Sequence, residues 1–188
     1  MSPARLTAEH VACLRGGRLL FEGLNLTLGP GEAALVTGGN GAGKSSLLRL
    51  LAGLLAPAAG RVAAVGRIAF HDERPALDPE LPLARALGFW AALDGGDADA
   101  ALATVGLDAL GEVPVRLLST GQRQRAALAR VIASRAPIWL LDEPGNGLDT
   151  ASLARLADAM AWHRLAGGIV VAASHQPLGL DKAKAVML

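Results

Sequence analysis

The chain has 188 residues, a formal charge of +1 and one cysteine, and is 52% hydrophobic but only 3% aromatic. This length gives one domain with a core of Ala, Leu and Val, and the near-neutral charge argues against a nucleic-acid surface as its main function. Because Cys13 is the single cysteine, an internal disulfide is excluded. The sequence has no signal-peptide pattern and no apolar run near the ~20 residues of a membrane-spanning helix, so we expect a soluble, cytoplasmic protein.

The first third of the chain is predicted to be mostly strands. Residues 10–14 and 19–28 are expected to pair, because leucines in the second run alternate with polar residues at period two. The apolar run 34–36 predicts a further strand, and leucines at helical spacing after residue 45 predict a helix that ends near Pro57. Residues 61–70 are predicted to be a further β-type stretch.

The middle of the chain changes to a helical pattern. Apolar residues at helical spacing predict a helix over 83–93. Asp97 is expected to cap a second helix that ends at Gly106, and a third helix begins near Gly121. On the third helix we expect an apolar face, with Arg123 and Arg130 elsewhere on the surface of the helix. The sequence therefore predicts a helical subdomain over about residues 72–134.

Two continuous apolar runs, 138–141 and 169–173, follow this region. Such runs are typical of buried parallel strands, and the segment between them predicts a helix over about 150–166. Strands that alternate with helices indicate a mostly parallel α/β sheet, with antiparallel strands at the N-terminus. We expect a single domain over residues 1–188.

A glycine-rich loop joins the strand at 34–36 to the helix that follows it. The sequence GGNGAGKS has the spacing G-x-x-x-x-G-K-S of a phosphate-binding loop. Its amides and the helix dipole favour phosphate oxygens, Lys44 adds a positive charge for the β and γ phosphates, and the Ser45 hydroxyl is a Mg²⁺ ligand. A glycine-rich turn that binds nothing is the alternative. The expected nucleotide contacts are Gly38, Gly39, Asn40, Gly41, Ala42, Gly43, Lys44, Ser45 and Ser46.

Polar residues also follow the two later apolar strands. The stretch IWLLDEP places Asp142 and Glu143 at the end of a buried strand, where one carboxylate can hold Mg²⁺ and the next can polarise a water molecule. His175 follows IVVAAS, where an imidazole can hydrogen-bond a γ phosphate. Taken singly, the acidic pair can arise by chance and the histidine can be an ordinary loop residue.

Two further stretches suit the same chemistry. LSTGQ at 118–122 opens the third helix, so its serine hydroxyl and free amides form a second anion site or an ordinary serine cap. GNGLD at 145–149 follows the acidic pair as a turn, which can equally be a plain connection.

Together and in this order, these five motifs resemble the ATPase domain of ABC transporters. The resemblance implies a head-to-tail pair of such domains that binds ATP and Mg²⁺, with each ATP held between two subunits. It places Lys44, Ser45, Asp142, Glu143 and His175 on one side of the nucleotide, with Lys44, Glu143 and His175 as the catalytic residues. The residues expected to contact the other subunit's nucleotide are Ser119, Gly121 and Gln122.

Flanking sequence resembles one branch of the family, the ATP-binding subunits of the haem exporter of cytochrome c biogenesis. The stretches that carry this likeness are LLFEGLNLTLGPGE, GNGAGKSSLLRLLAGL, LSTGQRQRAALAR and GGIVVAASHQPL. The resemblance implies integral membrane permease subunits, docked around residues 71–93, and a peripheral location on the inner face of the cell membrane. The alternatives are another ABC transporter's ATPase subunit, a soluble ABC protein of translation or DNA repair, or a regulator that hydrolyses little ATP.

The chain departs from the wider family at two binding positions. Where the family has a Mg²⁺-contacting glutamine, this chain has His71, Asp72 and Glu73, so Asp72 becomes a candidate metal ligand that adds negative charge near the γ phosphate. Many members also stack adenine on an early aromatic ring. Residues 11–15 contain no such ring, which predicts weaker or less base-selective binding.

Overall fold

The computed structural model describes residues 3–72 and 76–188. Its strands and helices are, in chain order, β1 (Arg5–Arg15), β2 (Arg18–Leu28), β3 (Ala33–Thr37), α1 (Lys44–Leu51), β4 (Ala59–Val65), β5 (Ile68–His71), α2 (Leu83–Asp94), α3 (Ala98–Thr104), η1 (Asp108–Leu110), η2 (Val115–Leu117), α4 (Thr120–Ala133), β6 (Ile138–Asp142), α5 (Thr150–Leu165), β7 (Ile169–Ala173) and β8 (Lys184–Met187). No helix in these ranges is long and apolar enough to cross a bilayer.

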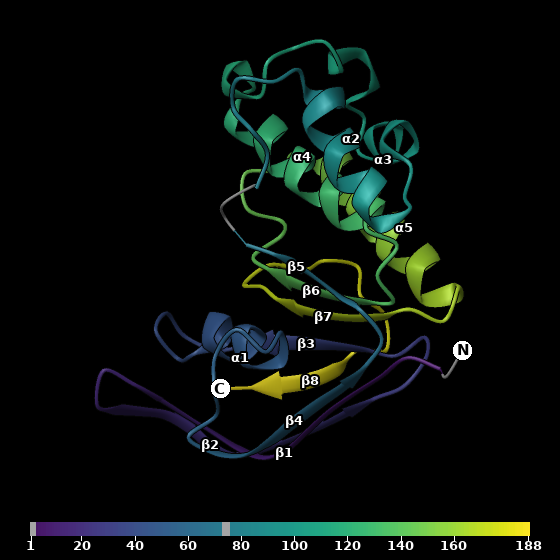
Figure 1. The fold of residues 1–188 in the computed structure, drawn as a ribbon. Helices are drawn as coiled ribbons and strands as arrows, with labels where there is room; N and C mark the ends of the chain where they lie inside the picture. Colours follow the sequence, from purple (N-terminus) through teal and green to yellow (C-terminus); the bar gives the residue numbers. More distant parts are fainter. Residues whose placement is uncertain (1–2, 73–75) are drawn as a thin grey trace.

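The described strands form two sheets (Figure 1). The larger has the order β5-β6-β7-β3-β8, and each neighbouring pair in it is parallel. The smaller, β2-β1-β4, is antiparallel. The predicted α/β fold, with a parallel core and antiparallel N-terminal strands, is confirmed.

The central strands are buried on both faces, which explains their continuous apolar sequences. In β6, Ile138 and Leu140 face the core between the two sheets, whereas Trp139 and Leu141 face the helices on the other side. Helix α1 lies between the two sheets (Figure 1), and its buried leucines belong to that inner core. This packing fixes the start of α1 against the ends of the parallel strands.

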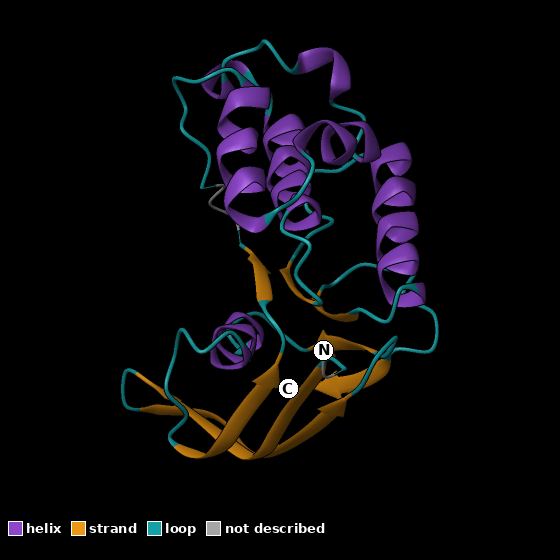
Figure 2. Cartoon of the chain, turned by 45° about the vertical axis from the view of Figure 1, so that its right-hand side comes forward, coloured by secondary structure: helices purple, strands orange, loops and turns teal. Residues whose placement is uncertain are grey.

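The chain between β5 and β6 forms α2, α3 and α4, which lie with α5 on the opposite side of the parallel sheet from α1 (Figure 2). The Asp97 side chain accepts a hydrogen bond from the Ala100 amide at 3.0 Å, so the predicted helix cap is confirmed. Residues 73–75 of the predicted subdomain lie outside the described residues. The 72–134 boundary and the single-domain assignment remain predictions.

Some local features differ from the predictions in detail. The β-type stretch 61–70 forms two strands, because the chain leaves the antiparallel sheet after β4 and enters the parallel sheet as β5. Between them Gly66 has φ 111°, and a β-carbon there would lie 2.7 Å from Cγ of Pro137. Helix α1 ends at Leu51, short of Pro57, and β8 was not predicted. Arg130 of α4 has its guanidinium 4.3 Å from the Trp90 ring centroid, and its Nε atom is buried.

Candidate functional site

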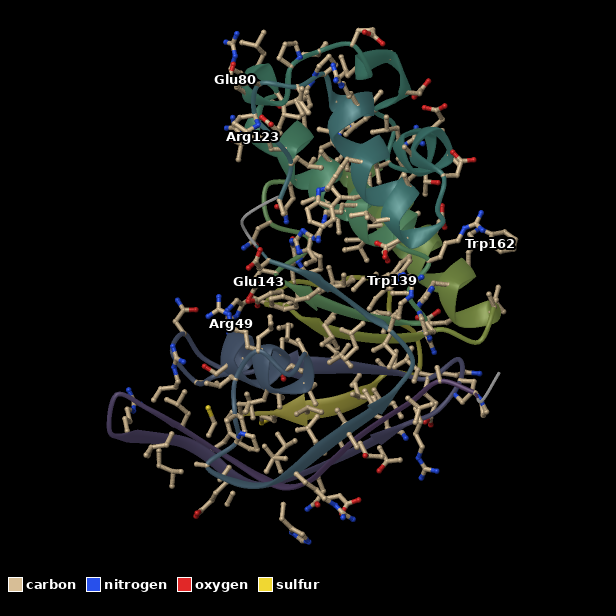
Figure 3. The ribbon with its side chains drawn as sticks, in the orientation of Figure 1. Arg49, Glu80, Arg123, Trp139, Glu143 and Trp162 are labelled. Atoms are coloured by element: carbon tan, nitrogen blue, oxygen red, sulfur yellow. The ribbon has the colours of Figure 1, made fainter. Side chains whose placement is uncertain are left out.

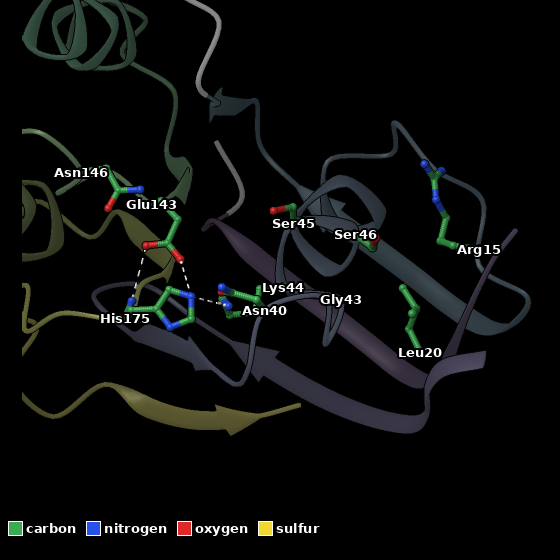
Figure 4. A pocket seen from close by; sticks show the side chains of 11 residues that line it. Arg15, Leu20, Asn40, Gly43, Lys44, Ser45, Ser46, Glu143, Asn146 and His175 are labelled. Carbon is green, nitrogen blue, oxygen red and sulfur yellow. Dashed lines mark hydrogen bonds and ion pairs between the residues drawn. The ribbon is translucent and has the colours of Figure 1, made fainter. Parts of the chain in front are cut away.

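A pocket of about 450 Å³ lies at the carboxyl ends of β3 and β6 (Figure 4). Ligands of α/β proteins bind at this edge of the sheet. Residues that line the pocket come from the β1–β2 hairpin, the glycine-rich loop, the start of α1 and the loops after β6 and β7. They are Arg15, Leu20, Asn40, Gly41, Gly43, Lys44, Ser45, Ser46, Glu143, Asn146 and His175.

The glycine-rich loop wraps the amino end of α1. Gly43 is the N-cap residue with φ 110°, a conformation that favours glycine, and a β-carbon there would lie 3.1–3.2 Å from side-chain atoms of Leu20 and Phe21. Gly38 has φ 150°, and its β-carbon would lie 2.6 Å from the Leu188 carbonyl oxygen. The first amides of α1 have no partner within the helix, so this end suits an anion.

Lys44 is buried, with only 7% of its surface exposed. Its ammonium donates to the carbonyl oxygens of Gly38 at 3.0 Å and Gly39 at 3.3 Å, and to Nε2 of His175 at 2.8 Å. The charge therefore lies beneath the loop, inside the pocket, with its hydrogen bonds made to groups of the chain itself.

Glu143 follows β6 in a strained backbone conformation, with φ 44°. Its amide donates to the Ala173 carbonyl at 2.9 Å, which ties the residue to the end of β7. Its Oε1 lies 3.3 Å from Nε2 of His175, and its Oε2 accepts from the His175 amide at 3.4 Å. Lys44, His175 and Glu143 thus form a continuous chain of contacts across the pocket (Figure 4).

Asp142 is the last residue of β6 and is 7% exposed. It precedes Glu143 directly but is not among the residues that line the pocket, whereas Ser45 is. A hydroxyl and a carboxylate are ligands that suit Mg²⁺, which proteins commonly bind through one or two carboxylates together with substrate phosphates. Within residues 3–72 and 76–188, no group of three or more His, Cys, Asp or Glu side chains is arranged to hold a metal alone.

The LSTGQ residues lie at the start of α4, apart from the pocket. Ser119 and Gln122 form a capping box: the serine hydroxyl accepts from the Gln122 amide at 3.2 Å, and Oε1 of Gln122 accepts from the Ser119 amide at 2.8 Å. A β-carbon at Gly121 would lie 3.0 Å from the Gly147 carbonyl oxygen. Figure 3 labels Arg123 near this helix start, well separated from Glu143. Within one chain, these residues do not meet the phosphate loop.

Asp72 is not brought to the pocket that Lys44 lines. It is half-buried and lines a separate pocket of about 400 Å³ with Arg130 and Asp94. Burial lowers the pKa of Arg130, and the charges of Asp94 and Asp72 oppose that shift. His71 is 2% exposed, and this burial lowers its pKa to about 4. Glu73 lies outside the described residues, and the assignment of Asp72 to the metal stays a prediction.

Three pocket residues were not singled out as site residues from the sequence. Asn146 belongs to the GNGLD turn and lies beside Glu143, so its motif was recognised but not its position. Arg15 lies at the end of β1, in the segment where many family members have an aromatic ring, and Leu20 lies on the next strand. The absence of an aromatic side chain from residues 11–15 was the only feature of the sequence that pointed to this end of the pocket.

Comparison with known proteins places the chain among ATP-binding proteins of transport. The sequence profile of the ABC transporter family matches residues 21–146. The chain is 58% identical over 182 residues to the cytochrome c biogenesis ATP-binding export protein CcmA of Zymomonas mobilis, covering 96% of this chain and 81% of that protein. Its identity to the protein of the same name from Sphingopyxis alaskensis is 60% over 178 residues, covering 93% and 92%. For Novosphingobium aromaticivorans the value is 53% over 188 residues, covering 100% and 97%.

Solved structures agree. A chain of an ABC transporter in an inward-facing conformation superposes with a TM-score of 0.82 at 27% identity, covering 100% of this chain and 80% of that one. The ATP-binding subunit of another ABC transporter gives a TM-score of 0.81 at 23% identity, covering 90% and 79%, which is a likeness of fold. The resemblance inferred from the five motifs is confirmed, and the chain belongs to the ABC transporter family.

Proposed function

We propose that this chain is the ATP-binding and ATP-hydrolysing subunit of an ABC export complex in cytochrome c biogenesis. The observation that carries the proposal is the meeting of Lys44, Glu143 and His175 at one pocket, from three parallel strand ends. Relatives at 53–60% identity, each a cytochrome c biogenesis ATP-binding export protein, support the assignment to this pathway. The cargo implied by the family likeness is haem.

The glycine-rich loop binds the triphosphate. Loop amides and the start of α1 surround the phosphates, as the nine residues 38–46 were expected to do. Lys44 exchanges its contacts with Gly38, Gly39 and His175 for the β and γ phosphate oxygens. This exchange needs little movement, because the ammonium already lies inside the pocket.

Ser45 and Asp142 would hold Mg²⁺, which would supply positive charge to neutralise the β and γ phosphates. Glu143 is the base that orients the attacking water, since its carboxylate enters the pocket one residue beyond Asp142. His175 donates to the γ phosphate through Nε2 once Lys44 has left that nitrogen.

Ser119, Gly121 and Gln122 act on the nucleotide of a second subunit in a head-to-tail pair. Their distance from the pocket of their own chain, and the exposure of Ser119, support this arrangement. Integral membrane permease subunits complete the complex, so the chain works at the inner face of the membrane.

Genetic complementation tests this function. In a bacterium that lacks its own ATP-binding subunit for cytochrome c biogenesis, expression of this chain should restore covalently haem-bound c-type cytochromes, detected by haem staining after denaturing electrophoresis. The Glu143→Gln variant, expressed to the same level, should not restore them. Absence of staining with the wild-type chain would overturn the export function, and equal staining with both proteins would show that the function does not need hydrolysis at Glu143.

A further inference from the structure

We propose that Arg15 and Leu20 form the base-binding end of the nucleotide pocket, and that the Arg15 guanidinium stacks on the base in place of an aromatic ring. The inference rests on the proposed function, since it takes the pocket to hold a nucleotide. It assigns substrate preference: purine nucleotides bind better than pyrimidine nucleotides, with little discrimination between adenine and guanine.

The position of the two residues carries the first step. Both line the same pocket as Lys44 and Ser45, and Figure 4 shows them at the end opposite Glu143 and His175. A nucleotide with its phosphates at Lys44 therefore extends its base toward Arg15. Among the described residues that line this pocket the only ring is His175, which lies at the phosphate end.

The local backbone structure directs the side chains of Arg15 and Leu20 toward the pocket. Cys13 pairs with Phe21, but the next residue, Leu14, pairs with Leu19, so Leu20 is the extra residue of a β-bulge. Bulges next to binding sites redirect a side chain. Arg15 ends β1 at a turn made by two glycines with φ 54° and 79°, and pairs with Arg18 across it. The tight turn holds the end of the hairpin beside the glycine-rich loop.

The chemistry of this pair fits the flat face of a base. A guanidinium is planar and delocalised, stacks on π systems and is weakly hydrated compared with an ammonium. Leu20 offers an apolar contact for the same ring. Purines have the larger face, so stacking favours them. A guanidinium that stacks on the face of the ring makes no hydrogen bond to the edge of the base, and Leu20 has no polar atom, so neither side chain reads the edge groups that distinguish adenine from guanine.

Calorimetric titration with the β,γ-imido analogues of ATP, GTP and CTP and with inorganic tripolyphosphate separates base contacts from phosphate contacts. For the wild-type protein, the ATP and GTP analogues should bind within about threefold of each other and more tightly than the CTP analogue. Arg15→Ala should weaken the ATP analogue by about 2- to 30-fold, the range of a stacked cation, and leave tripolyphosphate within about twofold. Arg15→Tyr should restore the affinity for the ATP analogue.

Arg18→Ala is the matched control, because it removes the same side chain from the paired position, which does not line the pocket. It should change no affinity. Equal weakening of the ATP analogue and tripolyphosphate by Arg15→Ala would assign Arg15 to the phosphates and overturn the proposal, as would an unchanged ratio of ATP-analogue to CTP-analogue affinity. A wild-type protein that binds neither nucleotide nor tripolyphosphate would instead overturn the proposed function, and this inference with it.

Discussion

Nζ of Lys44 lies 2.8 Å from Nε2 of His175. An ammonium only donates, so Nε2 accepts and the ring proton of a neutral His175 is on Nδ1. The same Nε2 lies 3.3 Å from Oε1 of Glu143, which is also an acceptor. One nitrogen cannot satisfy both neighbours at once. Binding of phosphate by Lys44 therefore releases Nε2 to carry a proton toward Glu143 or the γ phosphate.

Lys44→Ala should lower the affinity for ATP by about tenfold or more, because charge-assisted hydrogen bonds to the ground-state phosphates are lost. Calorimetric titration measures the change. Lys184→Ala is the control, since it removes the same charge from a partly exposed strand residue that pairs with Glu32, and should leave the affinity unchanged. Equal affinity of Lys44→Ala and wild type would show that the loop does not bind the phosphates.

Glu143→Gln should retain ATP binding, since the amide keeps the size of the side chain. Hydrolysis should fall by about 10²-fold or more, the lower range for a positioned base. Phosphate release under saturating ATP is the measurement, made on the assembled complex. A turnover rate equal to that of wild type would remove Glu143 from the role of base.

Hydrolysis should require two subunits. Ser119→Arg and Lys44→Ala proteins should each be inactive, and their mixture should recover part of the activity, because a mixed pair contains one site built from two intact halves. Ser119 also caps α4, at a cost of about 1 kcal/mol when replaced, so circular dichroism must first establish that the variant is folded. Undiminished activity from a strictly monomeric species contradicts the paired arrangement.

Stability should fall as the pH drops from 6.5 to about 4. Burial lowers the pKa of His163 from 6.5 to about 4, so within this window the unfolded chain binds a proton that the folded chain does not. The free energy of unfolding then decreases by up to about 3 kcal/mol on acidification. Urea denaturation at several pH values gives the slope of the free energy of unfolding against pH. This slope should be smaller for His163→Gln than for wild type, and the buried His71 should contribute the slope that remains. His10→Gln, at an exposed position, should keep the wild-type slope.

Asp72→Gln decides between two placements of that carboxylate. Beside Mg²⁺ and the γ phosphate, its charge would repel a metal-free nucleotide by about 4 kcal/mol at ~4 Å and an effective dielectric near 20, so the substitution would raise metal-free affinity. Beside Arg130, where the structure places it, the substitution should leave ATP affinity unchanged. Titrations with Mg²⁺ and with EDTA measure both values. A rise confined to EDTA supports the metal-ligand assignment.

Much of the site could be predicted because its parts are local or follow from strand order. The loop 38–45 is contiguous, and Glu143 and His175 each follow an apolar run that reads as a parallel strand, so their strands had to end at the same edge. Leu20 could not be placed, because the bulge that redirects it depends on how β1 and β2 pair. The break between β4 and β5 likewise depends on Pro137, distant in sequence, which packs against Gly66. Strand β8 has only 4 residues and is mostly exposed, which left too short a pattern to detect.

The three tryptophans of the chain all lie away from the pocket, and the chain has no tyrosine. Trp90 of α2 lies against Arg130 of α4, and Trp139 stacks on His163 at a centroid distance of 3.9 Å. Trp162 of α5 is 72% exposed. Figure 3 labels Trp139 and Trp162, both apart from Glu143. None can contact a bound nucleotide in the same chain. Phosphate binding by itself should therefore leave the tryptophan fluorescence unchanged. A change of Trp90 emission on adding ATP would show that the helices around Trp90 have moved.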